Sequence, residues 1–232
     1  MIALNEQAPT ILRANSLKTS TKHLIEELKH ENVESFQVPG FENAVQLEEK
    51  KNVFLTSAFK DGLFEVQDAG SQKIGEFLDV KPGMRVVDAC AGAGGKTLHL
   101  AALMENKGQI IAMDIHGWKL AELKRRAKRA GAHNIETREI TDNKVIKRLH
   151  EKADRLLIDA PCSGLGVLKR NPDSKWKIDQ DFIDRIRKEQ ETILQDYSKI
   201  IKKGGKMVYA TCSILPSENN EQVVAMVTQL ED

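Results

Sequence analysis

Disulfide and zinc frameworks are both absent from this sequence of 232 residues. It holds three cysteines, an odd number, and no Cys-x-x-Cys pair. Disulfide scaffolds use even numbers of cysteines, and zinc sites use closely spaced cysteine and histidine ligands. We therefore expect free thiols and no metal.

Long apolar segments and a strong net charge are missing as well. No apolar run approaches the roughly 18 residues that cross a bilayer, and residues 1–15 lack the basic-then-apolar order of a secretory signal. We expect a cytoplasmic protein without membrane contact. The net charge is +1, so any basic surface that binds nucleic acid must be local.

The pattern of apolar and polar residues changes near residue 64. Residues 1–63 predict short strands over 11–15, 35–39 and 44–47, and a helix over 20–30 with Ser20 as its N-cap. This part is expected to be a small α+β module of the RNA-binding type. Residues 64–232 are expected to form a second, larger domain.

The larger domain alternates helices with strands. Short apolar runs predict strands buried on both faces over residues 84–89, 109–114, 135–140, 155–159 and 206–211. Helices are predicted over 71–78, 121–131 and 182–202, the last closed by Gly204 and Gly205. Such alternation is typical of an α/β fold with a parallel, doubly wound sheet and right-handed crossovers.

A glycine-rich loop follows the first of these strands, where such sheets bind nucleotides and cofactors. A Walker A loop would need glycine at Cys90, and a dinucleotide loop would need it at Thr97, so both interpretations are disfavoured. A loop for S-adenosylmethionine remains. Asp114 supports it, because an acidic side chain at the end of the second strand holds ribose hydroxyls. A turn required only for tight packing stays open. The loop comprises Cys90, Ala91, Gly92, Ala93, Gly94, Gly95 and Lys96.

Asp142 comes two residues after the third predicted strand. A carboxylate there could accept a hydrogen bond from the amino group of adenine. The spacing itself favours a simpler role, the cap of a helix that begins near Asn143.

Two cysteines occupy matching positions at the ends of the last two strands. Cys162 stands in Asp159-Ala160-Pro161-Cys162-Ser163-Gly164, and Cys212 stands in Thr211-Cys212-Ser213. In the strand order 3-2-1-4-5 these strands are neighbours, so both thiols face one crevice. A lone buried cysteine is commonly a small hydrophobe, but a matched pair favours chemistry.

Methylation of cytosine at carbon 5 needs this arrangement. A thiolate that adds to carbon 6 makes carbon 5 nucleophilic, and a second thiol promotes release of the product. Asp159 would hold the proton on ring N3 and so relieve the charge built up by the addition. The residues alone do not tell which thiol attacks. Amine methylation is disfavoured, because Cys162 replaces the aromatic residue that amino-group methyltransferases carry there.

Together these stretches resemble the Sun (Fmu), RsmB-like family of 16S ribosomal RNA 5-methylcytosine methyltransferases. The resemblance also rests on Gln67-Asp68-Ala69-Gly70-Ser71-Gln72, on residues 12–19 and 170–176, and on Ser217-Glu218-Asn219. It implies a Rossmann-like class I methyltransferase fold, S-adenosylmethionine as cofactor and RNA as partner. It also implies that Cys212 attacks and Cys162 assists release. The exchanged assignment remains the competing hypothesis, since the nucleophile of DNA-type enzymes follows proline.

By the same resemblance, the loop from Cys90 to Lys96 lines the cofactor site together with Asp114, Asp142 and Asp159. Ala93 departs from the family pattern, which has proline there, and is expected to loosen the loop. The sequence ends at Asp232, after the helix that follows the fifth strand, where such enzymes usually continue into two further strands. We expect a C-terminally short domain, a fragment or a trimmed form. An inactive RNA-binding or ribosome-assembly protein is therefore the alternative function.

A basic segment follows Cys162 and is expected to contact RNA. The alternative is a solvated loop with its tryptophan packed inward. A second run of six Lys and Arg, over residues 119–129, fits the solvent face of a helix. A monomer is expected. The predicted RNA contacts are Lys169, Arg170, Lys175 and Trp176.

Overall fold

The computed structural model describes residues 7–231, which form two sheets. Residues 1–6 and Asp232, the outer ends of the two expected domains, lie outside the described residues. The strands are β1 (Ile11–Ala14), β2 (Ser35–Gln37), β3 (Ala44–Leu47), β4 (Phe64–Val66), β5 (Arg85–Asp88), β6 (Gln109–Asp114), β7 (Ile135–Glu139), β8 (Ala153–Asp159) and β9 (Ile201–Ala210). The α-helices are α1 (Thr21–His30), α2 (Ser57–Lys60), α3 (Ala69–Phe77), α4 (Gly95–Leu103), α5 (Gly117–Ala130), α6 (Asn143–Lys147), α7 (Gln180–Tyr197) and α8 (Asn220–Glu231).

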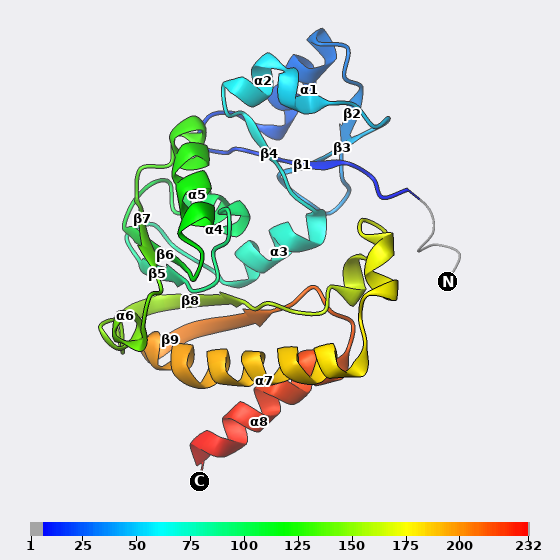
Figure 1. Ribbon diagram of the computed structural model, residues 1–232. Helices are drawn as coiled ribbons and strands as arrows, with labels where there is room; N and C mark the ends of the chain where they lie inside the picture. The colour runs from blue at the N-terminus through cyan, green and yellow to red at the C-terminus, as the bar shows by residue number, and fades with distance from the viewer. Residues whose placement is uncertain (1–6, 232) are drawn as a thin grey trace.

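The N-terminal module is a four-stranded antiparallel sheet covered by α1 and α2 (Figure 1). Its strand order is β2-β3-β1-β4. Ser20 caps α1 by accepting a hydrogen bond from the His23 amide, and Leu24 and Leu28 are fully buried beneath the helix. Strand β4 lies beyond residue 63 and pairs with β1, so this sheet continues through Val66. The division into two domains stays a prediction.

The second sheet confirms the predicted α/β architecture. Its five strands run in the order β7-β6-β5-β8-β9, and every neighbouring pair is parallel. Numbered within the domain, this is the expected order 3-2-1-4-5. The C-terminal ends of β8 and β9, which precede the two cysteines, therefore lie side by side.

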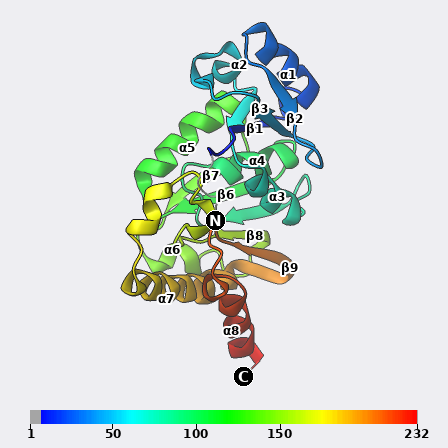
Figure 2. The ribbon, with the colours of Figure 1, turned by 90° about the vertical axis from the view of Figure 1, so that its right-hand side faces the viewer.

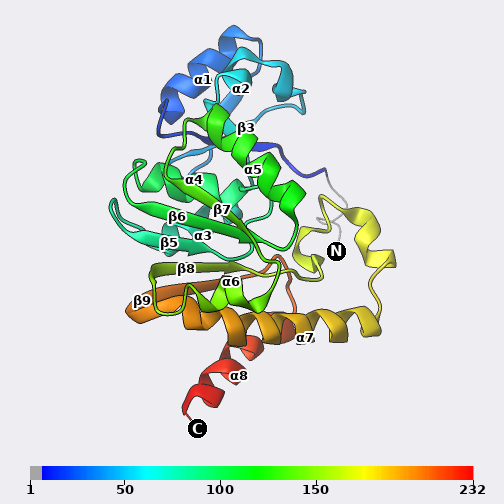
Figure 3. The same cartoon turned by 60° about the vertical axis from the view of Figure 1, so that its left-hand side comes forward.

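Helices cover both faces of this sheet (Figures 1 and 3). Alternation along the strands sends Val86 toward α3, α4 and α5, and its neighbour Val87 toward α6 and α7. Both valines are fully buried. In Figure 2 the N-terminal module, the parallel sheet and α7 stack in that order, with α8 extending from the far end. No helix within residues 7–231 is long and apolar enough to span a membrane.

The edge strands depart from the predicted burial on both faces. Strand β6 is buried nearly throughout. By contrast, every residue of β7 and nearly every residue of β9 is partly or fully exposed. An edge strand has a neighbour on one side only, and its polar residues face water. The expectation is therefore wrong for β7 and β9.

The predicted end of α7 is also wrong. The helix stops at Tyr197, a 3-10 turn covers Ser198–Ile200, and β9 begins at Ile201. Gly204, with φ 78°, serves an irregularity inside β9, where the pairing with β8 shifts register. A glycine with positive φ suits a bulge as well as a helix end, so the sequence alone did not separate the two.

Candidate active site

The turn between β5 and α4 is built around glycines with positive φ. Gly92 has φ 55° and Gly94 has φ 88°, a region that glycine adopts without steric cost. A Cβ on Gly94 would lie 2.5 Å from Cγ of Leu123 in α5, whereas a Cβ on Gly92 would meet no atom within 4 Å. Gly94 thus permits close packing, and Gly92 borders open space.

Asp114, at the end of β6, anchors this turn. Its residue is 8% exposed. Its Oδ2 accepts a hydrogen bond from the Gly92 amide at 2.9 Å, and its Oδ1 accepts one from the His116 amide at 2.8 Å. Each carboxylate oxygen has more than one lone pair. The same side chain therefore orders the loop and keeps acceptor capacity for a ligand hydroxyl.

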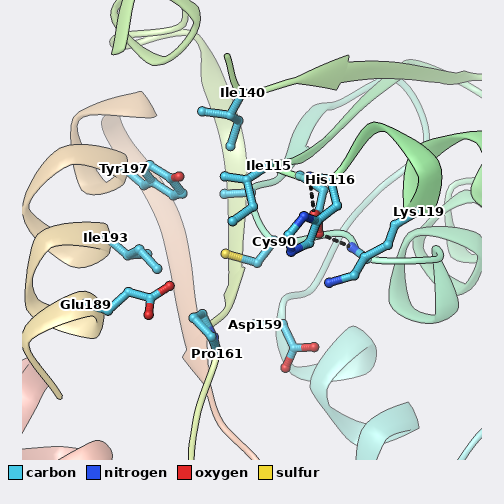
Figure 4. A pocket seen from close by; sticks show the side chains of 13 residues that line it. Cys90, Ile115, His116, Lys119, Ile140, Asp159, Pro161, Glu189, Ile193 and Tyr197 are labelled. Atoms are coloured by element: carbon cyan, nitrogen blue, oxygen red, sulfur yellow. Dashed lines mark hydrogen bonds between the residues drawn. The ribbon is translucent and has the colours of Figure 1, made fainter. Parts of the chain in front are cut away.

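A cavity of about 310 Å³ opens beside the turn, next to the ends of β6 and β8 and the flank of α7 (Figure 4). Four of the predicted site residues line it: Cys90, Gly92, Asp114 and Asp159. Ligands of doubly wound sheets bind at this edge. The remaining lining residues were not predicted as site residues; they are Ala89, Ile115, His116, Lys119, Ile140, Pro161, Glu189, Ile193 and Tyr197.

Apolar side chains enter this cavity from opposite walls. Figure 4 shows Ile115 and Ile140 on one side and Ile193 and Tyr197 of α7 on the other. Ile193 and Tyr197 belong to the apolar stripe of α7. The helical period identifies such a stripe, but it does not tell whether the stripe packs on the core or borders a ligand space.

A smaller cavity of about 120 Å³ shares Cys90 and Asp159 with the first. Asp88, in its wall, is a buried carboxyl group whose pKa is raised to about 7, chiefly by burial. Its Oδ2 accepts a hydrogen bond from Thr97 Oγ1 at 2.7 Å, while Oδ1 has no partner among the described residues. The other lining residues are Gln67, Ser71, Ala91, Gly95 and Lys96.

Asp159 connects the two cavities with the thiols. Its Oδ2 lies 2.6 Å from Nζ of Lys96, and the two side chains are 32% and 16% exposed. This partly buried ion pair joins the glycine-rich loop to the end of β8. Partial burial of the Cys212 thiol and the negative charge of Asp159 both raise the pKa of Cys212, against the larger effect of the hydrogen bond described next.

The two cysteines predicted to share a crevice are in contact. Their Sγ atoms are 3.1 Å apart, and the backbone amide of Cys212 donates to Sγ of Cys162 at 3.2 Å. Cys212 is exposed and Cys162 is partly buried. Neither lines the two cavities, but Asp159 and Pro161, just before Cys162, line the larger one. The thiols thus lie beside the ligand space.

Hydrogen bonding between the thiols separates their acidities. The hydrogen bond between the two thiols lowers the pKa of Cys212 to about 7 and raises the pKa of Cys162, so Cys162 is the donor once Cys212 is charged. Lys96 lowers the pKa of Cys212 further. Because Cys212 is the more exposed of the pair, water also favours the charge there. Of the two thiols, Cys212 is therefore the one that loses its proton first.

Asp142 lies apart from both cavities. Its side chain caps α6 by accepting a hydrogen bond from the Lys144 amide at 2.7 Å. The larger cavity is lined instead by Ile140, two residues earlier. The helix-cap role that its spacing favoured is therefore present, and a role toward a ligand stays a prediction.

The basic segment after Cys162 presents its tryptophan to solvent. Trp176 is 81% exposed, at the end of the 3-10 turn Pro172–Trp176, with Lys175 Nζ 5.2 Å from its ring centroid. The alternative with this ring packed inward is thus wrong. Arg170 pairs with Asp68 beside the N-terminal module, and Lys169 comes directly before it. Figure 1 shows this segment in yellow between the module and α7.

Two arginines join the glycine-rich loop to the N-terminal module. Arg13, which is 2% exposed, donates to the Gly95 carbonyl at 2.8 Å, and Arg126 donates to the Ala93 carbonyl at 2.7 Å. Arg126 also pairs with the buried Glu65 of β4. Ala93, where looseness was expected, lines neither cavity and is held through its backbone.

Residues 76–232 match the family model for the 16S rRNA methyltransferase RsmB/F, and residues 1–54 match the model for an RsmF/B-like ferredoxin-like domain. A relative from Synechocystis sp., named "Probable ribosomal RNA small subunit methyltransferase B", is 36% identical over 100% of this chain and 53% of its own length. The chain spans about half the length of the curated relatives it matches.

Solved structures share the fold. A methyltransferase homolog protein from Pyrococcus horikoshii superposes with a TM-score of 0.85 at 31% identity, over 98% of this chain and 72% of that one. NSun6 from Pyrococcus horikoshii, solved with SFG, gives a TM-score of 0.88 at 22% identity, over 97% of this chain and 81% of that one. The second likeness concerns the fold alone.

Proposed function

The chain belongs to the 16S rRNA methyltransferase RsmB/F family, and from this premise we propose that it methylates carbon 5 of a cytosine in RNA through a covalent adduct with Cys212. The observation that carries the proposal is the contact between the two thiols, 3.1 Å apart, at the ends of adjacent strands. The relatives' names favour 16S ribosomal RNA as the substrate.

S-adenosylmethionine is the cofactor of this family of methyltransferases and fits the cavities. Gly92 borders open space that a Cβ would fill. Asp114 has acceptor capacity for the ribose hydroxyls. Oδ1 of Asp88, which has no partner among the described residues, could accept a hydrogen bond from an ammonium group. Ile115 and Ile140 offer apolar surface for an adenine ring. When bound there, the cofactor supplies an electrophilic methyl group.

Cys212 would act as the nucleophile because it is the more exposed and more acidic thiol. Its thiolate forms a bond to carbon 6 of the cytosine, and the ring electrons then make carbon 5 nucleophilic. After carbon 5 has gained the methyl group, its proton passes to solvent, the electrons of the broken C–H bond re-form the ring double bond, and the Cys212 thiolate leaves carbon 6. Cys162, 3.1 Å away, donates a hydrogen bond to that departing sulfur.

Asp159 would hold the proton that ring N3, unprotonated in free cytosine, takes up from solvent as Cys212 adds. Pairing with Lys96 at 2.6 Å keeps Asp159 oriented at the edge of both cavities. Hydrogen bonding at N3 stabilises the charge that develops as Cys212 adds. Lys96 would thus have two roles: it would orient Asp159 toward the cytosine ring, and it would belong to the cofactor loop.

The target cytosine must leave its stack to reach Cys212, which is easiest in a loop or bulge of RNA. Trp176, with Lys175 beside it, offers a stacking surface and a cation, and Lys169 and Arg170 add positive charge along the same segment. Work on ribosomal RNA would put the protein in the cytoplasm. That location and a monomeric state remain predictions.

Single cysteine variants test the proposal on denaturing gels with S-adenosylmethionine and ribosomal RNA. Cys162→Ala should accumulate a covalent RNA adduct, because addition proceeds and release is slowed. Cys212→Ala should neither methylate nor crosslink. RNA of the same length without cytosine serves as the control and should give no adduct.

Two results would contradict this assignment. An adduct that forms with Cys212→Ala and not with Cys162→Ala would exchange the thiol roles. A well-folded parent protein that shows no binding in a titration with S-adenosylmethionine would favour an inactive RNA-binding or assembly protein.

A further inference from the structure

Glu218 is a buried carboxylate that lies outside both cavities. It ends the 3-10 turn Pro216–Glu218 and is 0% exposed. Burial by itself raises the pKa of this carboxyl, but the hydrogen bonds from Ser163 and Ser213 outweigh burial and leave the pKa below its usual value. Glu218 is therefore charged, in a place where an unpartnered charge would be costly.

The partners of this charge come from both cysteine turns. Oε1 accepts hydrogen bonds from the hydroxyls of Ser163 and Ser213, each at 2.5 Å. Oε2 accepts from the Ser163 amide at 2.8 Å and from Nε2 of Gln190 in α7 at 3.0 Å. Ser163 directly follows Cys162, and Ser213 directly follows Cys212. One carboxylate thus binds the residue after each thiol.

Further contacts join the two cysteine turns, and we call this set of bonds around the Glu218 carboxylate the Glu218 junction. The two serine hydroxyls are 3.1 Å apart, and the Gly166 amide donates to the Cys212 carbonyl at 2.8 Å. A Cβ on Gly166 would lie 2.7 Å from that carbonyl oxygen. The pairing of β8 with β9 ends at Asp159 and Ala210, so beyond that point these bonds, together with the bond from the Cys212 amide to Sγ of Cys162, set the spacing of the thiols.

We infer that Glu218 is a positioning residue, which holds the Cys162 thiol where it donates to Cys212 and so keeps Cys212 in its reactive form. The inference deepens the proposed function and rests on it for its purpose. The ionisable groups that act on Cys212 are Cys162, Asp159 and Lys96. Among them, Cys162 is the one whose place depends directly on the Glu218 junction.

The variant Glu218→Gln distinguishes a positioning role from a direct electrostatic effect, because the two explanations predict shifts of opposite sign in the pKa of Cys212. Removal of a nearby negative charge favours a thiolate and would lower the pKa of Cys212. Loss of positioning raises it, because the glutamine NH₂ group faces hydroxyl donors and the turns separate. We expect the midpoint of Cys212 alkylation by iodoacetamide to rise from about 7 toward the ordinary thiol value of about 8.5, with labelling near neutral pH slowed roughly tenfold.

A double-mutant cycle tests whether Glu218 acts through Cys162. Cys162→Ala removes the donor itself and should raise the Cys212 midpoint by a similar amount. Adding Glu218→Gln to Cys162→Ala should then give little further change, since the shared route is already lost. Peptide mapping by mass spectrometry reads Cys212 separately from the other thiols.

Glu136→Gln is the matched control: Glu136 of β7 also accepts hydrogen bonds from two side chains, those of Arg138 and Gln109, lies at the opposite edge of the sheet from β9, and should leave the Cys212 midpoint unchanged. If Glu218→Gln does not fold, Ser213→Ala removes one arm of the junction and should give a smaller rise. A folded Glu218→Gln with an unchanged or lowered midpoint, or a shift that adds fully to that of Cys162→Ala, would overturn the inference.

Alkylation needs neither RNA nor cofactor, so the inference and the proposed function fail separately. A raised midpoint without any RNA adduct in the cysteine variants would leave the positioning role intact and remove the cytosine chemistry. Where methylation is measurable, Glu218→Gln should lower kcat more than it raises KM, and higher pH should restore part of the rate.

Discussion

At the scale of single residues, burial of the Asp88 carboxyl group in the candidate site lowers the stability of the folded protein. The side chain is buried at the end of β5, and burial raises its pKa to about 7, with the Thr97 hydrogen bond acting in the opposite direction. The pKa of an aspartate in an unfolded chain is about 3.9. Between these values the folded protein binds more protons than the unfolded one, so stability falls as pH rises from about 4 to about 7.

Asp88→Asn should remove this pH dependence while keeping the acceptor for Thr97. At about pH 8 we expect the variant to be more stable than the parent, on the order of 3 kcal/mol, and at about pH 4.5 the gain should nearly vanish. Urea unfolding of both proteins at the two pH values measures the difference. An equal difference at both would mean that Asp88 titrates normally.

At the scale of elements, the sequence was sufficient to predict features that depend on local patterns of apolar residues and on short motifs. Alternating helices and apolar strands predicted the parallel sheet and its order, and the loop residues from Cys90 to Lys96 and the two thiols stood out as motifs. The sequence missed features that depend on partners distant along the chain. Strand β4 is three residues long and is defined by its pairing with β1. Glu218 is bound by Ser163 and by Gln190 of α7, both of which lie far from it along the chain.

In the turn between β5 and α4, Gly92 and Gly94 are required for different reasons. Gly94→Ala should cost about 2 kcal/mol of unfolding free energy, because its Cβ would lie 2.5 Å from Leu123 Cγ at a positive φ. Gly92→Ala should cost about 1 kcal/mol, since nothing lies within 4 Å, and should weaken binding of S-adenosylmethionine more than it weakens the fold. Denaturant unfolding and a cofactor titration on both variants compare the effects. Equal losses of stability would refute the packing argument for Gly94.

At the scale of the whole molecule, the N-terminal module and the cofactor loop form one bonded unit. Glu65 of β4 accepts from Arg126 of α5 at 2.8 Å, and the same arginine donates to the Ala93 carbonyl at 2.7 Å. Arg13 of β1 reaches the Gly95 carbonyl from the other side. No local pattern predicts these contacts, because each joins residues far apart in sequence. A module expected to contact RNA thereby holds the backbone of the loop expected to bind the cofactor.

Arg126→Ala should therefore affect both parts at once. The change removes a hydrogen bond to the loop and one of two arginine partners of the buried Glu65, at a cost of about 2 kcal/mol. The freed Ala93 carbonyl should let the loop move, and affinity for S-adenosylmethionine should fall severalfold. Arg125→Ala is the matched control, because Arg125 is 79% exposed and pairs only at the surface with Glu122; its effect should stay below about 0.5 kcal/mol. If both variants bound the cofactor as tightly as the parent, the module would hold the loop without influencing its ligand.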